Sequence, residues 1–394
     1  MFDVVVIGGG PSGATAAEDL ARSGHHVALL DREGRIKPCG GAIPPRLIED
    51  FAIPSSQIVA RINTARMISP TQRKVDIPIE NGFVGMVDRE HFDPFLRRRS
   101  QGAGATWLTG TFLRIERDAD HPTVIYRDKD SGEERRLACK VIIGADGARS
   151  KVAKSEVPNG DKIPYVIAYH EIIEAPLEGM SYDPKRCDVI YDGAISPDFY
   201  GWVFPHGKSA SVGMGTGIEG VDLKKATAEL RAAHGLSDCK TIRREGAPIP
   251  LRPLDCWDNG TDVVLAGDAA GVVAPSSGEG IYYAMVGGRV AATAASCCGF
   301  TASSSASPRQ AAAGSVPTAR PGWAAANRWA EASLATTACT RSRGTRPLAM
   351  SGNSKAWAMR PRPITPKVSG EKVLNRETSA REACWMPDQP TLNS

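Results

Sequence analysis

The sequence predicts an α/β fold in which a parallel sheet is combined with a second, mixed or antiparallel sheet. Three observations support this prediction. Residues 1–31 contain a strand, a glycine-rich turn, a helix and a second strand. Two later apolar strands each place an aspartate behind a glycine at their end. Between those strands lie short segments that are typical of antiparallel strands, such as residues 187–193 and 209–215, and a short helix over residues 224–234.

The N-terminal segment forms a complete Rossmann-type unit. Residues 2–8 read FDVVVIG, as expected of a buried parallel strand, and the turn over residues 8–13 reads GGGPSG before an alanine-rich helix. Gly8 allows the tight turn, Gly10 lets the backbone approach a pyrophosphate, and Gly13 lets helix and strand pack closely. Free N–H groups at the helix start favour a diphosphate. The residues expected to bind a dinucleotide here are Gly8, Gly10, Ser12 and Gly13.

The second strand of the unit, residues 25–31, ends in Asp31. Asp31 follows Gly13 by 18 residues, which is where a carboxylate is needed to accept hydrogen bonds from a ribose. The alternative is a solvated residue at the end of a strand. We expect Asp31 to bind the cofactor.

Two further strands end in similar turns. Residues 140–150 read KVIIGADGARS, and residues 261–280 read TDVVLAGDAAGVVAPSSGEG. Asp146 and Asp268 therefore lie at the carboxyl ends of parallel strands, the edge at which α/β sheets bind ligands. Taken singly, each Gly-Asp pair is also common in turns.

Together, the three motifs resemble the sequence marks of the flavoprotein hydroxylases and reductases that carry a single Rossmann domain. The resemblance implies bound FAD. It also implies that Asp268, behind Gly267, binds the ribityl hydroxyls and that Asp146 helps to hold the diphosphate.

Other segments make the resemblance more specific. They are KPCGGAIPP (37–45), MISPTQRKVDI (67–77), GMVDREHFDPFLRRR (85–99), YGWVFP (200–205) and PSSGEGI (275–281). With them the chain is similar to the geranylgeranyl reductases, above all the branch that serves chlorophyll and bacteriochlorophyll synthesis in photosynthesis. The resemblance extends from Met1 to about Ala295. It implies an NADPH-dependent reductase that converts the geranylgeranyl chain of (bacterio)chlorophyll, or geranylgeranyl diphosphate, to its phytyl form.

The chemistry of such a substrate sets requirements on the site. Isolated alkenes have no carbonyl to polarise them, so protonation must accompany or precede hydride delivery and builds carbocation character. The site should be dry, apolar and aromatic, with one proton donor. Tyr200, Trp202 and Phe204 alternate along a strand and so share one face, and their rings can stabilise a cation. Simple core packing is the alternative for these three, and His206 is more typical of a turn than of a base.

Cys39 lies in a loop rich in glycine and proline after the second strand. We hypothesise that its thiol borders the isoalloxazine ring and takes part in proton delivery, while Gly40 and Gly41 let the backbone approach the ligand. The alternative is that Cys39 is a small buried residue of a tight loop with a purely structural role. Lys37 either touches a phosphate or is solvated.

Residues 275–280 are expected to open the last regular helix. Gly278 and Gly280 would let N–H groups face the flavin pyrimidine, which gains negative charge on reduction. Glu279 could instead cap this helix.

The cofactor half is expected to be discontinuous, comprising residues 1–60, 100–155 and 255–295. Residues 60–100 and 156–254 would form the substrate half, whose antiparallel sheet is the floor of an apolar tunnel. Because the sequence contains no second complete fingerprint, we expect NADPH to bind transiently at the surface, with ferredoxin as an alternative donor. An aromatic hydroxylase and a non-enzymatic prenyl-lipid carrier remain alternative functions.

Residues 296–394 differ from the rest of the chain. They hold 13 Lys+Arg against 5 Asp+Glu, whereas residues 1–295 hold 35 and 39. They lack apolar periodicity, yet they contain four of the seven tryptophans. The alternatives are a disordered basic extension and a translation out of frame, and the abrupt loss of pattern favours the second. No function is inferred from this tail.

Composition excludes several other classes of protein. The nine cysteines show no zinc-binding spacing, so no metal site is expected, and they indicate a reduced, intracellular protein. The apolar runs are too short for a membrane span. Contact with a photosynthetic membrane is expected only from the hydrophobicity of the substrate. The oligomeric state is left open.

Overall fold

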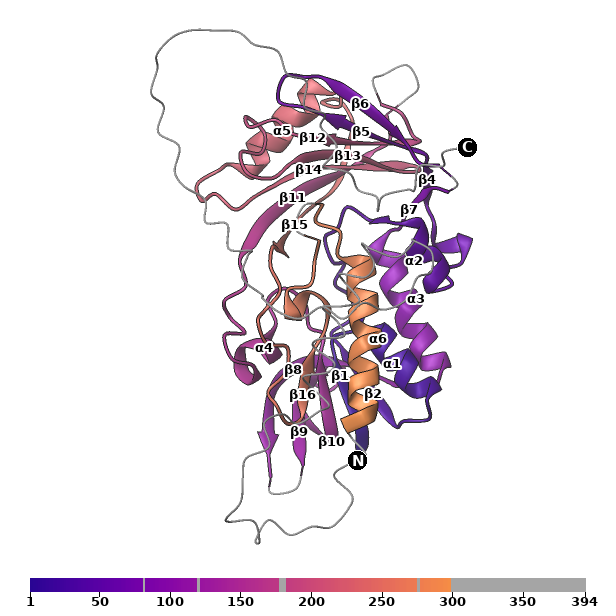
Figure 1. Ribbon diagram of the computed structural model, residues 1–394, viewed down its shortest axis with the longest axis vertical. Coiled ribbons are helices and arrows are strands. Elements are labelled where there is room, and N and C mark those ends of the chain that lie inside the picture. Colours follow the sequence, from indigo (N-terminus) through magenta and orange to yellow (C-terminus); the bar gives the residue numbers. More distant parts are fainter. Residues whose placement is uncertain (81, 119–120, 177–181, 275–276, 299–394) are drawn as a thin grey trace, which may run out of the picture. The chain divides into compact units, whose positions relative to one another are not determined.

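The computed structural model describes residues 1–80, 82–118, 121–176, 182–274 and 277–298 (Figure 1). The predictions made for residues 299–394, and for Pro275 and Ser276, lie outside the described residues. Within the described part the predicted α/β fold is confirmed, with a Rossmann-type sheet and a second, mixed sheet.

The first sheet has β1 at its centre, between β2 and β10, and these neighbours run parallel to it. Beyond them lie β8 next to β2 and β16 next to β10, also parallel. A sixth strand, β9, pairs antiparallel with both β8 and β10. The strands are β1 (Phe2–Ile7), β2 (Val27–Asp31), β8 (Thr106–Arg117), β9 (Pro122–Asp128), β10 (Glu134–Gly144) and β16 (Val263–Leu265).

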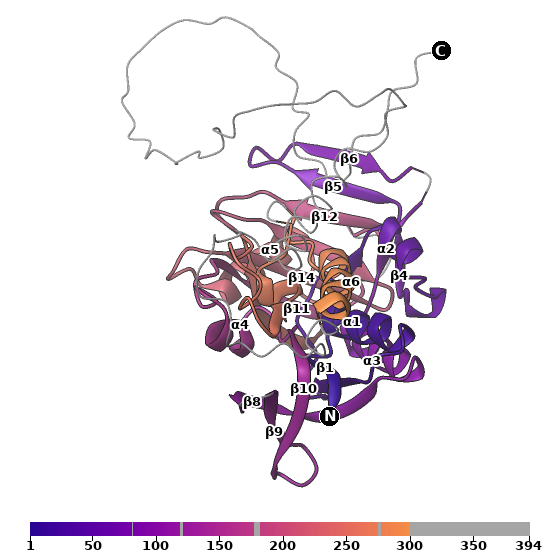
Figure 2. The same ribbon diagram turned by 60° about the horizontal axis from the view of Figure 1, so that its bottom comes forward.

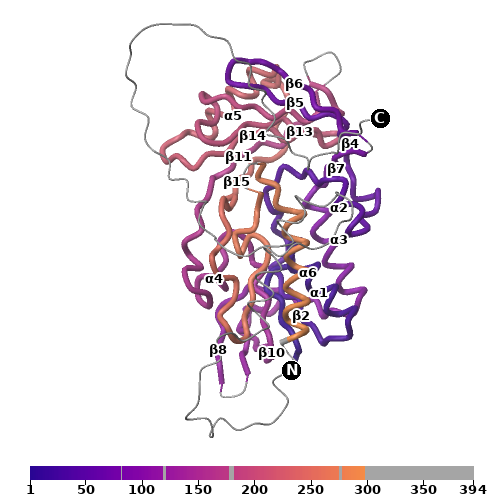
Figure 3. Tube along the Cα trace, in the orientation of Figure 1, coloured from indigo at the N-terminus to yellow at the C-terminus, as the bar shows by residue number. Residues whose placement is uncertain are grey.

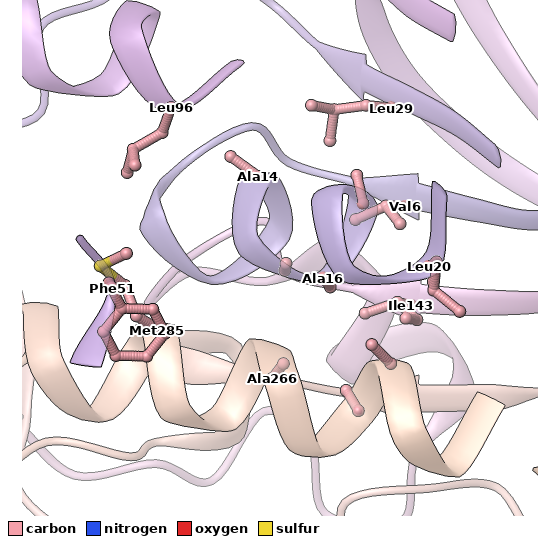
Figure 4. Packing of buried hydrophobic residues seen from close by; sticks show 14 of the residues in the cluster. Val6, Ala14, Ala16, Leu20, Leu29, Phe51, Leu96, Ile143, Ala266 and Met285 are labelled. Carbon is pink, nitrogen blue, oxygen red and sulfur yellow. The ribbon is translucent and has the colours of Figure 1, made fainter. Parts of the chain in front are cut away.

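Three helices pack beside this sheet. They are α1 (Pro11–Arg22), α3 (Arg89–Gly102) and α6 (Ile281–Cys298), and α1 contacts both of the others. Figure 4 shows Ala14 and Leu20 of α1 beside Val6 and Leu29 of the sheet, with Met285 of α6 in the same core. Leu96 of α3 belongs to this core as well, although the sequence placed residues 60–100 with the substrate half. The boundary between the two halves stays a prediction.

The second sheet has seven strands in the order β15-β11-β14-β13-β12-β5-β6, all of them labelled in Figure 1, and Figure 2 shows β6, β5 and β12 in succession. All neighbours are antiparallel except β12 and β5. Helix α5 (Leu223–Ala233) covers one face, where Leu230 packs against Val203, Val212 and Met214. The strands are β5 (Thr64–Ile68), β6 (Lys74–Pro78), β11 (Tyr165–Glu174), β12 (Arg186–Ile190), β13 (Gly201–His206), β14 (Ser209–Thr216) and β15 (Thr241–Pro250).

Short elements connect these parts, and their course can be followed in Figure 3. A three-stranded sheet of β3, β7 and β4 lies next to α2. The short elements are β3 (Ala42–Ile43), α2 (Pro45–Asp50), β4 (Ala60–Ile62), β7 (Val84–Met86), α4 (Lys151–Glu156) and two 3-10 turns, η1 (Ser55–Gln57) and η2 (Gly267–Ala270). Two of them, α4 and η2, follow directly on the strand ends β10 and β16 that the sequence marked as cofactor-binding.

Candidate active site

The glycine-rich turn after β1 has the tight geometry that the sequence predicts. Gly8 has φ of 104°, in the left-handed region that favours glycine. A side chain at Gly13 would place its Cβ 1.9 Å from the Gly8 carbonyl oxygen, so α1 and β1 meet too closely for any other residue. At Gly10, by contrast, an added Cβ would meet nothing within 4 Å. The turn is therefore tightly packed against the backbone at Gly8 and Gly13, whereas Gly10 faces free space.

The start of α1 fits a bound diphosphate. Gly10 is its N-cap and provides no side-chain hydrogen bond, so the first N–H groups of the helix are not capped by a side chain. The buried Ser12 Oγ has no hydrogen-bond partner among the described residues. An unpaired buried hydroxyl costs about 1–3 kcal/mol, which a phosphate oxygen of bound FAD would offset. The residues present therefore fit the cofactor.

Two other elements converge on the same serine. A Cβ at Gly267 of η2 would lie 2.9 Å from the Ser12 Cβ. A Cβ at Gly288 of α6 would lie 2.1 Å from the Ser12 carbonyl oxygen. The fold thus brings the predicted Gly267 turn against the predicted Ser12.

Asp31 lies at the end of β2, as predicted, and faces the glycine-rich turn. Its Oδ2 accepts a hydrogen bond of 2.8 Å from the Gly9 N–H, and its Oδ1 accepts one of 2.8 Å from the Glu33 N–H. The buried Arg97 lies 3.4 Å from Oδ1 and donates to the Gly9 carbonyl oxygen at 3.1 Å. Sequence reasoning missed Arg97, because nothing distinguishes it among three consecutive arginines. The ribose role of Asp31 stays a prediction.

Asp146 lies after β10, as predicted, and also has a local role at the start of α4. Its carboxylate accepts hydrogen bonds from the Ser150 hydroxyl and, at 2.7 Å, from the Lys151 N–H, so it caps the start of α4. Burial raises the pKa of this carboxyl above its usual value. The backbone nevertheless lies against the glycine-rich turn, since a Cβ at Gly8 would be 2.9 Å from the Asp146 Cα. The role of Asp146 toward the diphosphate stays a prediction.

Asp268 lies in the first turn of η2 and is joined to the loop after β2. Lys37 Nζ is 2.5 Å from Asp268 Oδ2, and a Cβ at Gly280 would be 3.7 Å from Oδ1. Neither expectation for Lys37 anticipated this ion pair. The loop after β2 and the start of α6 therefore both meet η2 at the predicted ribityl-binding carboxylate.

The loop of Cys39, Gly40 and Gly41 lies against strand β13. A Cβ at Gly40 would be 3.2 Å from the Phe204 ring, and His206 Nε2 lies 3.0 Å from the Gly40 carbonyl oxygen. The Gly41 N–H donates to Cys39 Sγ at 3.3 Å. His206 is the last residue of β13 and lies just outside the turn in which it was expected. Burial lowers the pKa of its imidazole, so His206 holds this loop as a neutral ring.

A buried ion pair lies next to the Cys39 thiol. Arg89 Nε is 2.6 Å from Asp93 Oδ1, Arg89 Nη2 is 2.8 Å from Asp93 Oδ2, and the same guanidinium contacts Cys39. Although burial opposes it, Asp93 keeps the pKa of Arg89 above its usual value. Sequence reasoning missed this pair, for which the spacing of four residues on a helix was the available signal.

The three predicted aromatic residues lie together on one face. Their rings follow one another, with centroids 6.0 Å apart for Tyr200 and Trp202 and 6.2 Å apart for Trp202 and Phe204. All three are buried. The Tyr200 hydroxyl donates to the Ser277 carbonyl oxygen at 2.5 Å, and burial raises the pKa of this phenol. We call Tyr200, Trp202 and Phe204 the aromatic row.

The segment before α6 also reaches the aromatic row. Gly278 has φ of 66°, and a Cβ there would lie 3.4 Å from the Tyr200 hydroxyl oxygen. Glu279 Oε1 accepts a hydrogen bond of 2.9 Å from the Tyr282 N–H, so Glu279 caps α6. Burial raises the pKa of Glu279 to about 7. The open alternative for Glu279 is thus settled in favour of the cap, while the roles of Gly278 and Gly280 toward the flavin stay predictions.

Comparison with known proteins places the chain in one family. The pyridine nucleotide-disulphide oxidoreductase model matches residues 2–177. A geranylgeranyl diphosphate reductase of Rhodobacter capsulatus is 67% identical over 294 residues, which cover 75% of each chain. The chloroplastic geranylgeranyl diphosphate reductase of Oryza sativa is 41% identical over 306 residues, covering 74% of this chain and 65% of the rice protein.

A solved structure agrees with these matches. The geranylgeranyl bacteriochlorophyll reductase-like protein of Thermoplasma acidophilum superimposes with a TM-score of 0.68 at 25% identity, covering 75% of this chain and 77% of that one. The glycine-rich turn, the unpaired Ser12 hydroxyl and the convergence of η2 and α6 on it fit the FAD that such a fold binds. The chain therefore belongs to the geranylgeranyl reductase family of FAD-dependent oxidoreductases.

Proposed function

We propose that the chain saturates the double bonds of a geranylgeranyl chain, carried by chlorophyll or bacteriochlorophyll or present as geranylgeranyl diphosphate, with NADPH as the electron source. The observation that carries this proposal is the buried aromatic row, which lies against the Cys39–Gly41 loop. FAD, when bound, supplies the hydride that such a reduction requires.

The residues of the chain meet the needs of an apolar alkene. The rings of Tyr200, Trp202 and Phe204 exclude water and present π faces to positive charge that develops on a tertiary carbon. Cys39 Sγ is the atom we propose to take part in proton delivery, since it lies in the loop that contacts Phe204 and His206. The buried Arg89–Asp93 pair lies next to this thiol.

NADPH is proposed to bind transiently at the surface. The described strands include one unit of strand, glycine-rich turn and helix, formed by β1, α1 and β2, and we assign it to FAD. No described helix is both long and apolar enough to cross a membrane. Contact with a membrane surface is proposed because the prenyl substrate is itself lipid-like.

Mass spectrometry tests the proposed function. The FAD-loaded protein is incubated with geranylgeranyl-bacteriochlorophyll and NADPH, without oxygen, and we expect the prenyl chain to gain successive pairs of hydrogen atoms. The absence of a mass gain with bound, reducible FAD would overturn the proposal. A product that gains oxygen in air would identify a hydroxylase, and a purified protein without a flavin absorption band would favour a carrier.

The role of Cys39 has its own test. We expect Cys39→Ser to keep normal FAD content and to lower turnover, because a serine hydroxyl is a much weaker acid than a thiol. Cys297→Ser is the matched control, since Cys297 is exposed and lies near the far end of α6 from the site. A Cys39→Ser protein with full turnover would refute the proton-delivery role.

A further inference from the structure

A line of buried polar side chains crosses four neighbouring strands and ends at Trp202. Its members are Glu245 on β15, His170 on β11, Ser211 on β14 and Trp202 on β13, in the order in which these strands pair. His170 is directly opposite Glu245 in the register of one strand pair and opposite Gly213 in the next. Gly213 is in turn opposite Trp202. We call Ser211, His170 and Glu245 the polar line.

Two contacts of the polar line are hydrogen bonds, and the third, between His170 and Glu245, is a charge contact outside hydrogen-bond geometry. Trp202 Nε1 donates to Ser211 Oγ at 3.0 Å, and His170 Nδ1 lies 2.9 Å from the same oxygen. His170 Nε2 lies 3.2 Å from Glu245 Oε2. Ser211 is 0% and His170 is 3% exposed, so water does not compete for these contacts. Glu245 is also paired with Arg243, whereas the hydrogen-bond partners given for the Ser211 hydroxyl are both members of this row of contacts, Trp202 and His170.

The donor and acceptor inventory gives the line a direction. An indole N–H can only donate, so Ser211 Oγ accepts from Trp202 and has its own hydrogen to give. Because a carboxylate oxygen can only accept, the His170 ring directs its Nε2–H toward Glu245, and its Nδ1 shares the Ser211 oxygen with the indole. The carboxylate thus orients the imidazole, the imidazole orients the hydroxyl, and the hydroxyl orients the indole.

Gly213 provides the space in which the Trp202 indole packs. A Cβ at this position would lie 2.6 Å from Trp202 Cζ2 and 2.4 Å from the His170 Cβ. The absence of a side chain therefore lets the indole lie against strand β14. The His170 and Trp202 ring centroids are 6.1 Å apart. Trp202 is the one member of the aromatic row whose polar atom is tied into its own sheet.

We propose that Ser211, His170 and Glu245 are positioning residues that fix the Trp202 indole, and with it the place along the prenyl chain where positive charge is stabilised. This inference rests on the proposed function. The three residues act through Trp202 and do not themselves touch the substrate.

The first test reads the indole directly and needs no substrate. The FAD-loaded protein is labelled with 15N-indole tryptophan, and the Trp202 N–H resonance is identified by its loss in Trp202→Phe. We expect Ser211→Ala and His170→Leu to move this resonance upfield, and His170→Asn, which keeps an acceptor, to restore part of the shift. An unmoved resonance in Ser211→Ala would overturn the proposal.

The second test is a double-mutant cycle on turnover. We expect Ser211→Ala to lower kcat by about 10- to 100-fold with little change in KM, as a misplaced group in the transition state does. In the Trp202→Phe background, which lacks the indole N–H, the same change should have no further effect. Equal losses in both backgrounds would show that Ser211 acts otherwise than through Trp202.

A matched control separates positioning from stability. Thr227→Val removes another buried hydroxyl, which donates to Leu223 O at 2.8 Å within α5, on the opposite face of the same sheet. It should leave both the resonance and kcat unchanged. If the wild-type protein reduces no prenyl chain while the resonance shifts as expected, the proposed function fails and the structural line stands. If prenyl reduction occurs without the shift, the inference alone fails.

Discussion

Gly10 and Gly13 belong to one turn, but only one of them is needed for folding. A Cβ at Gly13 would clash with the Gly8 carbonyl oxygen, whereas a Cβ at Gly10 would enter open space. We expect Gly10→Ala to fold normally and to bind FAD at least about tenfold more weakly, because its methyl group enters the space proposed for the diphosphate. Isothermal titration with FAD and a thermal unfolding curve check both halves of this prediction.

The control for this prediction is Gly102→Ala. Gly102 ends α3, and a Cβ there also meets nothing within 4 Å. FAD affinity should not change in this variant. Equal FAD affinity in Gly10→Ala and the wild-type protein would contradict the assignment of the turn.

Glu279 makes the stability of the flavin-free protein depend on pH. Burial raises the pKa of this carboxyl from 4.5 to about 7, so between these values the folded chain binds more protons than the unfolded chain. Its contribution is complete below about pH 4.5 and is lost as the pH rises through about 7, a change of roughly 3 kcal/mol.

Glu279→Gln tests this dependence. The amide can still accept the Tyr282 N–H, but it does not ionise. We expect the variant to exceed the wild-type free energy of unfolding at about pH 8 by a few kcal/mol and to match it at about pH 5. Denaturant unfolding at both pH values is the measurement, and parallel curves for the two proteins would refute the assignment.

At the scale of elements, the contact between α1 and α6 depends on one glycine of a pair. A Cβ at Gly288 would lie 2.1 Å from the Ser12 carbonyl oxygen, whereas a Cβ at Gly287 would meet its nearest atom at 3.4 Å. We expect Gly288→Ala to lower the free energy of unfolding by about 1–3 kcal/mol or more, since the helices must separate. Gly287→Ala should be neutral or slightly stabilising. Thermal unfolding of the two variants decides between these outcomes, and equal midpoints would contradict the packing described.

The regular elements of the first sheet could be predicted because their signals are local. The apolar run of β1, the glycines before α1 and the strand ending at Asp31 each follow from a few adjacent residues. The shared face of the aromatic row follows from the two-residue period of a strand.

The contacts that assemble the site could not be predicted, because they join distant segments. The Lys37–Asp268 pair spans 231 residues, and Arg97 reaches the glycine-rich turn from a helix whose sequence gives no sign of it. For Asp146 the local signal is present in the sequence, but it does not distinguish between two roles. A glycine and an aspartate at a strand end look alike whether the carboxylate caps the next helix or faces a ligand.

At the scale of the whole described body, two loops are among the places where the cofactor-binding elements contact the second sheet, beside the Arg243–Glu90 pair and the Tyr165–Ala148 hydrogen bond. His206 of β13 lies 3.0 Å from the Gly40 carbonyl oxygen, and the Tyr200 hydroxyl donates to the Ser277 carbonyl oxygen at 2.5 Å. Both loops flank residues that we assign to FAD. If bound FAD makes these loops more rigid, it should therefore stabilise β13 as well as β1 and α1.

Hydrogen exchange followed by mass spectrometry tests this coupling. We expect FAD to slow exchange in peptides from β1 and α1 and also in peptides from β13 and β14, because a ligand stabilises every element whose opening releases it. Peptides from the exposed edge strand β6 serve as the internal control and should change least. Tyr200→Phe removes the hydrogen bond to the Ser277 carbonyl oxygen and should reduce the protection of β13 without reducing that of β1. Protection confined to β1 and α1 in the wild-type protein would show that the aromatic row is held independently of the cofactor.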